Sequence, residues 1–290
     1  MNRTLTVIQL LSTPLLIAAS AQPVLAAAGP VAKVSAVPGA VVRWAAPGTT
    51  QCGMKGRSWA ALRGTCYYPV DLLQAPGPVT ISRTGAAGKR ELGQIIVEPF
   101  DYGTEKIDLP DIPQGNPSPQ DVQRNSRDRL RLGNTIFNRK EGPAKFTLPL
   151  GLPAKPLPKG KSFGVTRYFN GKLDPQPHTG TDYLTPVGSP ILSVADGTAV
   201  VAEELFFEGN AVFVDHGDGL ISMYFHLSDI KVKAGQQVKK GDTLGRVGTT
   251  GRSTGPHLFF GMRWHNARIN PQFLLEDPSK IPAVSHRPTK

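Results

Sequence analysis

The C-terminal part of the chain, residues 162–276, consists of short apolar runs separated by Gly or Asp-Gly turns. Within several runs apolar and other residues alternate with the period of a half-buried β-strand, and no long helical pattern interrupts them. Strands joined by such short turns pair antiparallel. The sequence therefore predicts a compact antiparallel β domain, with strands at Pro190–Ala195, Thr198–Glu203, Ala211–Val214, Ile221–His226, Thr243–Val247 and His257–Arg263.

Residues 30–109 are rich in Pro and Gly and carry short alternating apolar runs. This pattern predicts a small N-terminal β module. The module contains no His and no cluster of carboxylates, so we expect it to act as a spacer, to shape a substrate site or to contact a partner rather than to perform chemistry. Its predicted strands are Val34–Arg43, Ser58–Leu62, Val79–Ser82 and Gln94–Pro99.

Residues 110–161 connect the two β regions. Ser118 followed by Pro119 and, three residues after the cap, Asp121 is a typical helix start, and it predicts a helix over Gln120–Asn138. Arginines dominate this helix and apolar positions are few, so it should lie on a surface. Residues 142–161 are rich in Pro and Lys and predict an extended linker. The expected fold class is mainly β with this connecting helix.

The first residues, 1–26, have the pattern of a secretory signal peptide. Arg3 precedes an apolar run, and small residues up to Ala26 and Ala28 suit signal peptidase. A transmembrane anchor is less favoured because the run is short and is interrupted by polar residues and Pro14. We therefore expect export to the periplasm or cell envelope and no membrane span in the mature chain. Residues 277–290 are expected to form a disordered tail.

Two features fit an exported protein. Cys52 and Cys66 are the two cysteines, and in an oxidising compartment they predict a disulfide, because neither the spacing nor a nearby His supports a metal site. The net charge of +11 suits a polyanionic neighbour such as a cell-wall polymer or an anionic lipid surface. A solubilising surface explains the charge equally well. Nucleic acid is not expected, since the basic residues are scattered without interleaved aromatics.

The chemistry of the chain centres on the strand that contains His257 and Phe259. Residues i and i+2 of a strand share a face, so these two side chains point the same way. Earlier segments supply His178 with Asp182 four residues on, and His226. Histidines and a carboxylate that converge from distant positions are typical of a zinc hydrolase site.

The order and spacing of the motifs resemble the lysostaphin-type (LytM-like) zinc endopeptidases, which cut peptidoglycan cross-links. The resemblance covers about residues 162–275 and the N-terminal half only loosely. The matching segments are Phe163-Gly164, Phe169-Asn170-Gly171, His178-x-Gly-x-Asp182, Ala195-Asp196-Gly197, Gly209-Asn210, Asp215-His216-Gly217, Tyr224-Phe225-His226-Leu227, Val247-Gly248-Thr249-Thr250-Gly251 and Thr254-Gly255-Pro256-His257.

The resemblance implies a role for each matching residue. His178 and Asp182 correspond to zinc ligands, and His226 and His257 to the catalytic pair, which would position and deprotonate water. His216 corresponds to a structural residue of a turn. Loops near Asn210 and Arg252 to Pro256 are expected to form the walls of the substrate groove, which would include Asn210, Tyr224 and Thr254.

The third zinc ligand of the family is a histidine, and this chain has Phe259 in its place. Phenylalanine has no lone pair for a metal, and zinc sites in catalysis normally keep three protein ligands. Zinc is therefore expected to be weakly held or absent. His265 and His286 are the histidines that could supply a substitute ligand.

Two functions from different classes follow. One is a peptidoglycan endopeptidase that hydrolyses amide bonds in peptidoglycan peptides, favoured by the survival of both catalytic histidines. The other is a catalytically impaired LytM-like module that binds peptidoglycan or activates another cell-wall hydrolase, favoured by Phe259. Under both hypotheses the protein binds peptidoglycan.

Overall fold

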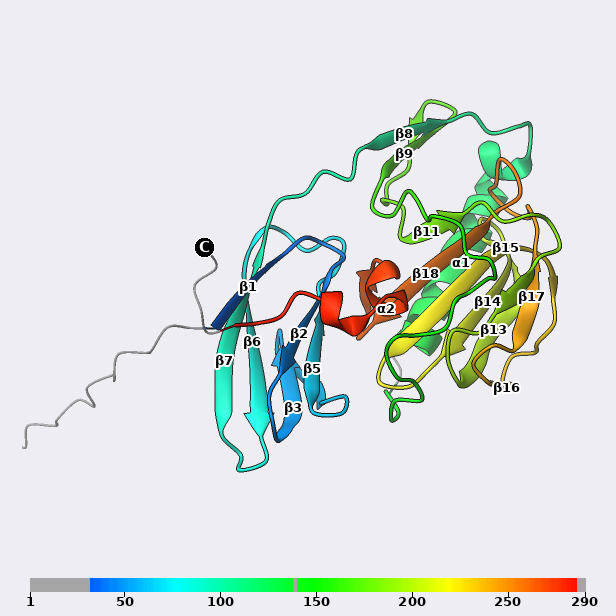
Figure 1. Ribbon diagram of the computed structural model, residues 1–290. Coiled ribbons are helices and arrows are strands. Elements are labelled where there is room, and N and C mark those ends of the chain that lie inside the picture. Colours follow the sequence, from blue (N-terminus) through cyan, green and yellow to red (C-terminus); the bar gives the residue numbers. More distant parts are fainter. Residues whose placement is uncertain (1–31, 138–139, 286–290) are drawn as a thin grey trace, which may run out of the picture. The chain divides into compact units, whose positions relative to one another are not determined.

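The computed structural model describes residues 32–137 and 140–285. The predicted signal peptide lies outside these residues, as does the end of the tail. The chain is mainly β, as predicted, with one long helix, α1, in the connector (Figure 1). None of the helices in the described part is long and apolar enough to cross a membrane.

The N-terminal module contains a five-stranded sheet in the order β1-β7-β6-β3-β4 and a separate pair, β2 with β5. The predicted single strand Val34–Arg43 is wrong. It is two strands that belong to different sheets, because a turn at Gly39 (φ +80°) reverses the chain between them. The bounds are β1 Ala32–Ala36, β2 Val41–Ala45, β3 Thr49–Met54, β4 Arg57–Ala60, β5 Thr65–Pro69, β6 Gly77–Gly85 and β7 Arg90–Val97.

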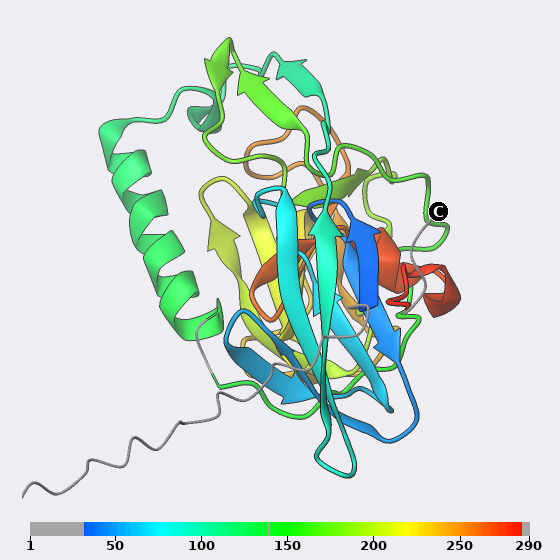
Figure 2. The same ribbon diagram turned by 90° about the vertical axis from the view of Figure 1, so that its left-hand side faces the viewer.

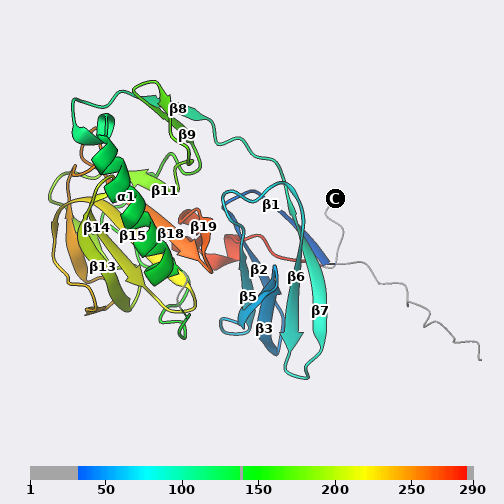
Figure 3. The same ribbon diagram turned by 180° about the vertical axis from the view of Figure 1, so that it is seen from behind.

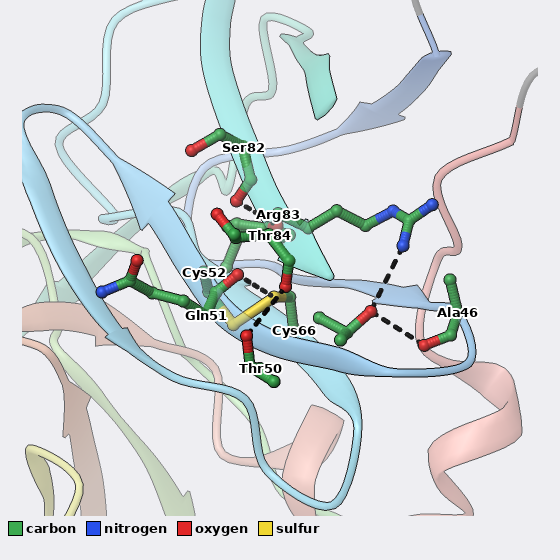
Figure 4. Close-up of a disulfide and its surroundings, with 10 residues drawn as sticks. Ala46, Thr50, Gln51, Cys52, Cys66, Ser82, Arg83 and Thr84 are labelled. Carbon is green, nitrogen blue, oxygen red and sulfur yellow. Dashed lines mark hydrogen bonds between the residues drawn. A yellow bond between two sulfur atoms is a disulfide. The ribbon is translucent and has the colours of Figure 1, made fainter. Parts of the chain in front are cut away.

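The predicted disulfide is present and joins the two sheets of this module. Cys52 on β3 and Cys66 on β5 are both buried, with their Cα atoms 5.4 Å apart. Figure 4 shows the bond lying against Gln51, whose carbonyl is 3.6 Å from the sulfur of Cys66. The disulfide thus ties the five-stranded sheet to the β2–β5 pair.

Replacing both cysteines with alanine should lower the free energy of unfolding by about 3 kcal/mol, because the bridge closes a loop of 14 residues in the unfolded chain. Alanine leaves little volume unfilled, so loop entropy dominates. Urea unfolding of the oxidised protein and of the Cys52→Ala/Cys66→Ala variant measures the difference. Equal stabilities would contradict a restraining role for the bridge.

Strand β8 (Thr104–Ile107) precedes the connector and pairs parallel with β9 (Thr166–Phe169). Figure 2 shows these strands with β10 at the top of the view. After the short helix η1 (Pro113–Gly115), helix α1 (Pro119–Leu132) starts at the predicted cap. Ser118 accepts a hydrogen bond from the backbone of Asp121, and the side chain of Asp121 accepts one from the backbone of Ser118. The chain then continues as a π-helical turn, η2 (Gly133–Phe137), so the predicted α-helix is shorter than expected.

Residues 142–161 do not form a free linker, which corrects the prediction. The segment has no regular structure, but Phe146, Leu150 and Ala154 are buried in the core of the C-terminal domain. Their burial explains why a Pro- and Lys-rich sequence also carries apolar residues at intervals.

The C-terminal domain is an antiparallel sheet in the order β11-β18-β15-β14-β13-β16, as its turns predicted. Strand β17 pairs with β12 and β15, and β19 pairs with β18. The bounds are β9 Thr166–Phe169, β10 Lys172–Leu173, β11 Gly180–Tyr183, β12 Pro190–Leu192, β13 Gly197–Leu205, β14 Gly209–Asp215, β15 Leu220–Ile230, β16 Gln237–Val238, β17 Thr243–Val247, β18 Leu258–Trp264 and β19 Ala267–Ile269.

The two faces of this sheet are covered differently. Residues such as Val212 and Phe260 face the main core. On the opposite face Phe213 and Met223 pack against Leu132 and Ile136 at the end of α1 and in η2. Figure 3 shows α1 lying across this side of the sheet. The connector therefore covers part of the face that also carries the candidate site.

Residues 277–285 are packed into the fold, which corrects this part of the predicted disordered tail over 277–290; residues 286–290 lie outside the described part of the chain. Helices α2 (Gln272–Leu275) and η3 (Pro278–Lys280) follow β19. Ile281 is buried, and the chain then pairs with the N-terminal module through Lys33 and Arg43. Backbone pairing and burial hold this segment in place although its sequence is polar.

Candidate functional site

The predicted site residues meet where β11, β18 and β15 run side by side. Asp182 on β11 is opposite Phe259 on β18, and Phe259 is opposite Phe225 on β15. His178 precedes β11 by two residues, and His257 immediately precedes β18. The strand order therefore brings three segments that are distant in sequence to one place.

A β-bulge brings His226 to the same place. Two residues of β15, Phe225 and His226, lie opposite the single residue Ala211 of β14, and His226 has φ +66°. Both side chains consequently line the same pocket. Simple alternation would have put Tyr224 on the side of His226. Tyr224 is instead fully buried in the core, where its hydroxyl accepts a hydrogen bond from the backbone of Val194, so its predicted place in the groove is wrong.

Asp182 is the charged centre of the site. One carboxylate oxygen, Oδ2, accepts hydrogen bonds from Arg167 (2.6 Å) and Ser162 (3.1 Å). The other, Oδ1, is buried without a hydrogen bond and faces Nε2 of His178 at 3.4 Å and Nε2 of His257 at 3.6 Å. Burial alone would raise the pKa of Asp182, but His178, Arg167 and His257 together hold it well below its usual range.

The backbone fixes the orientation of the imidazole rings. Nδ1 of His178 lies 2.9 Å from the carbonyl of Ser162, and Nδ1 of His257 lies 2.9 Å from the carbonyl of Gly255. Each Nδ1 donates to a backbone carbonyl, which holds the ring with its Nε2 toward Oδ1 of Asp182. The sequence-predicted pair of His178 and Asp182 is thus brought together with donor atoms facing each other.

His226 and His257 also meet, with ring centroids 4.7 Å apart. Nδ1 of His226 donates to the carbonyl of Thr250 at 2.8 Å. Burial, with His257 beside it, lowers the pKa of His226 to about 3. The ring is therefore neutral in the folded protein at ordinary pH.

Phe259, at the position that the resemblance gives to the third ligand, is well packed. Its ring is 5% exposed, stacks on Phe225 with centroids 4.4 Å apart, and meets the ring of His178 edge-on at 5.1 Å. Gly180 makes room for it, since a Cβ there would lie 2.4 Å from the ring. In the described part of the chain no group of three or more His, Cys, Asp or Glu side chains could hold a metal ion. The residues present therefore do not fit a zinc site with three protein ligands.

The pocket beside this cluster has a volume of about 430 Å³. Its walls combine aromatic rings with five arginines, and α1 and η2 contribute one side of it. Asn210 and Thr254, predicted for the groove, are not among its lining residues, whereas the neighbouring Arg252 is. The charged and aromatic lining residues include Arg129, Arg167, Arg252, Arg263, Arg268, Asp174, Glu208, Phe137, Phe169, Phe207, Phe213, Phe225 and Phe259.

His216 and His265, the other two histidines in the described part of the chain, do not belong to this cluster. His265 packs against Trp59, with ring centroids 4.2 Å apart, and donates from Nδ1 to Glu141, so it is not placed as a substitute ligand. His286 lies outside the described residues. His216 is fully buried, donates from Nδ1 to the carbonyl of Asp196 and accepts at Nε2 from the hydroxyl of Ser222, each at 2.8 Å. Its geometry is that of a structural residue.

His216 should make the protein less stable in mild acid. Burial lowers its pKa to about 4, although hydrogen bonding to Asp196 opposes this and Lys145 adds to it. In the unfolded chain the pKa is about 6.5, so between these values only the unfolded chain binds the proton. Stability is retained above about pH 6.5 and falls by about 2 kcal/mol on going to pH 5.

Urea unfolding of the wild type and of a His216→Gln variant at pH 7 and pH 5 isolates this contribution. Glutamine retains a donor and an acceptor but does not titrate. The loss between the two pH values should therefore be smaller in the variant by about 2 kcal/mol. Identical losses in the two proteins would assign the acid sensitivity to other groups.

Comparison with known proteins identifies the domain. Residues 176–271 match the model of the family described as Peptidase family M23. This chain carries an M23 peptidase domain, of the LytM/lysostaphin type. A protein of Pseudomonas aeruginosa assigned to peptidase M23 has a similar crystal structure, with a TM-score of 0.62 and 29% identity, covering 82% of this chain and 94% of that one. The M23 domain accordingly lies in the part of the chain that holds the candidate site.

Several relatives of this domain have names that describe an activity on peptidoglycan or its peptides. The chain is 38% identical over 114 residues to the peptidoglycan DD-endopeptidase ShyA of Vibrio cholerae. The matched region covers 39% of this chain and 25% of ShyA. It is 42% identical over 94 residues to the DD-carboxypeptidase/endopeptidase Mpg of Neisseria meningitidis, covering 32% of this chain and 22% of Mpg. The match thus spans about a quarter of the length of these relatives.

Proposed function

We propose that this chain is an exported, peptidoglycan-directed protein whose M23 domain binds peptidoglycan peptides and does not hydrolyse them by zinc chemistry. The observation that carries the proposal is Phe259, which fills with a packed aromatic ring the position that a third ligand would need. A metal held by His178 and Asp182 alone would be bound far more weakly than by three protein ligands.

The pocket supports a binding role. It is preformed, lies on rigid strands and combines apolar walls with a few polar groups, which is typical of a ligand site. The relatives named for peptidoglycan endopeptidase activity make peptidoglycan the proposed ligand. Export to the periplasm or cell envelope, which the predicted signal peptide favours, would bring the protein to that polymer.

The second candidate function is amide hydrolysis, and one observation favours it. His226 and His257 remain side by side in the arrangement expected of a catalytic pair. A binding module has no evident need for two adjacent imidazoles at this place. Hydrolysis by this chain would require a group outside the described cluster to complete a metal site.

Incubation of the mature protein with purified peptidoglycan sacculi tests the two functions together. We expect the protein to cosediment with sacculi and to release no soluble peptides during prolonged incubation, with or without added zinc. A hydrolysis assay with a second wall hydrolase present shows whether binding also activates a partner. Release of cross-linked peptides by the chain alone would replace the proposal with the endopeptidase. Failure to cosediment would remove peptidoglycan as the ligand.

A further inference from the structure

The arginines of the pocket are unequally neutralised. Arg167 pairs with Asp182 and Glu105, Arg252 with Asp174 at 2.5 Å, and Arg268 with Asp71 at 3.3 Å. Arg263 and Arg129 remain, and the described residues provide neither of them with a carboxylate partner within ion-pair distance. The pocket therefore contains two guanidinium groups whose charge is not matched locally.

Arg263 is the more unusual of the two. It lies directly opposite Arg268 on the antiparallel strands β18 and β19, a position in which like charges destabilise a sheet. Its guanidinium donates to the side-chain oxygen of Asn266 and lies 4.0 Å from the centroid of the Phe137 ring. Neither neighbour is charged. A half-buried cation beside a second cation is costly unless an anion joins it.

Other charged groups near the pocket also affect Arg263. Burial lowers the pKa of Arg263 to about 10, and the nearby positive charges of Arg268 and Arg129 act in the same direction, while the carboxylate of Asp71 opposes them. Burial also raises the pKa of Glu208, one of the two acids in the lining, although the charges of Arg129 and Arg252 act against this rise.

We propose that Arg263, with Arg268 opposite it and Arg129 on α1, binds the free carboxylate of an acidic peptide in this pocket. Arginine forks match carboxylates with paired hydrogen bonds, and these are strong in a partly buried site. The aromatic walls at Phe213 and Phe225 would hold the apolar part of the same ligand. A phosphate lacks that apolar part, so a peptide fits the lining better.

This inference rests on the proposed function, because peptidoglycan stem peptides combine alanyl groups with free carboxylates. It adds to that function a specific chemical requirement: a stem peptide should bind through its carboxylate and not through its backbone alone. It also gives the connector a role, since Arg129 comes from α1 and Phe137, which packs on Arg263, comes from η2.

Calorimetric titration of the mature chain tests the requirement. The probes are the tripeptide L-Ala-γ-D-Glu-meso-diaminopimelate and the same tripeptide with its carboxyl groups amidated. The free acid should bind about tenfold more tightly, the effect of one charge-assisted interaction. Arg263→Gln and, separately, Arg129→Gln should remove most of this preference by weakening binding of the free acid.

Arg127→Gln is the matched control, because Arg127 is exposed on the same helix and does not line the pocket. It should retain the full preference. Arg129 is also exposed, so its replacement tests the site even if the Arg263 variant folds poorly. Equal binding of acid and amide overturns the inference. The inference is also overturned if inorganic phosphate competes for the pocket as well as the free tripeptide does, because the site would then bind anions in general.

Cosedimentation with sacculi separates this inference from the proposed function. If the protein binds sacculi but has equal affinities for the acid and the amide, the proposed function stands and the carboxylate site is overturned. A preference for the acid in a protein that does not bind sacculi would support the site and overturn peptidoglycan as the polymer recognised.

Discussion

A Phe259→His variant should purify with about one zinc ion per chain, whereas the wild-type chain should carry almost none. Nε2 of His178 and Oδ1 of Asp182 lie 3.4 Å apart, a separation that suits two ligands of a tetrahedral zinc with bonds of about 2.0–2.2 Å. Oδ1 has no hydrogen bond to give up. Residue 259 lies directly opposite Asp182 on the adjacent strand, so a histidine there would complete the set.

The gain in affinity should be large. A residue that only supports a zinc ligand typically contributes about 10–100-fold to metal affinity, and a direct ligand should contribute more. Elemental analysis after dialysis against trace zinc gives the stoichiometry, and a competing chelator gives the affinity. An imidazole also replaces a ring that packs well on Phe225, so the metal-free variant should be less stable than the wild type.

Two controls make this result specific. Phe259→His combined with Asp182→Asn should lose the zinc again, because an amide is a poor ligand for zinc. Phe225→His places an imidazole in the same pocket at the wrong position and should bind no zinc. About one zinc in the wild-type chain would mean that a further group completes the site. Zinc in neither protein would mean that His178 and Asp182 are not ligands.

Local patterns made most of the fold predictable. Alternation and Gly turns predicted the antiparallel sheet, the Ser118 to Asp121 box predicted the start of α1, and two cysteines in a chain expected to be exported predicted the disulfide. The errors came from tertiary burial. Residues 142–161 and 277–285 are polar on average, and they are ordered because a few side chains, such as Phe146 and Ile281, enter a core that only the whole fold creates.

The candidate site was predictable through its motifs but not through its strand geometry. Period-two alternation puts Tyr224 and His226 on one face, and the bulge at Phe225 and His226 cannot be read from residue types. Arg167 and Arg263 were missed as members of the site, because arginines are common in this chain and their roles depend on which charges the sheet places beside them. The histidine motif indicated the position of the candidate site. The arginines that set the charge of this site are brought to it only by the folded chain.

An Arg167→Gln variant should be destabilised by about 3–5 kcal/mol, the cost of leaving one member of a buried ion pair without its partner. The side chains of Arg167 and Asp182 are 13% and 8% exposed, and their closest atoms are 2.6 Å apart. Removing the guanidinium leaves a buried carboxylate with Ser162 and two imidazoles. Arg167 also pairs with Glu105 on β8, so the variant should loosen the small sheet of β8, β9 and β10 as well.

A double-mutant cycle identifies the cause. Asp182→Asn removes the charge that Arg167 neutralises, so Arg167→Gln in that background should cost much less than it does alone, and the two losses should not add. Urea unfolding of the four proteins gives the coupling energy. Additive losses would mean that Arg167 stabilises the protein through Glu105 and the sheet of β8, β9 and β10, and not through Asp182. A large coupling would mean that, in a chain with Phe259, an arginine supplies the positive charge that Asp182 needs to remain ionised in the site.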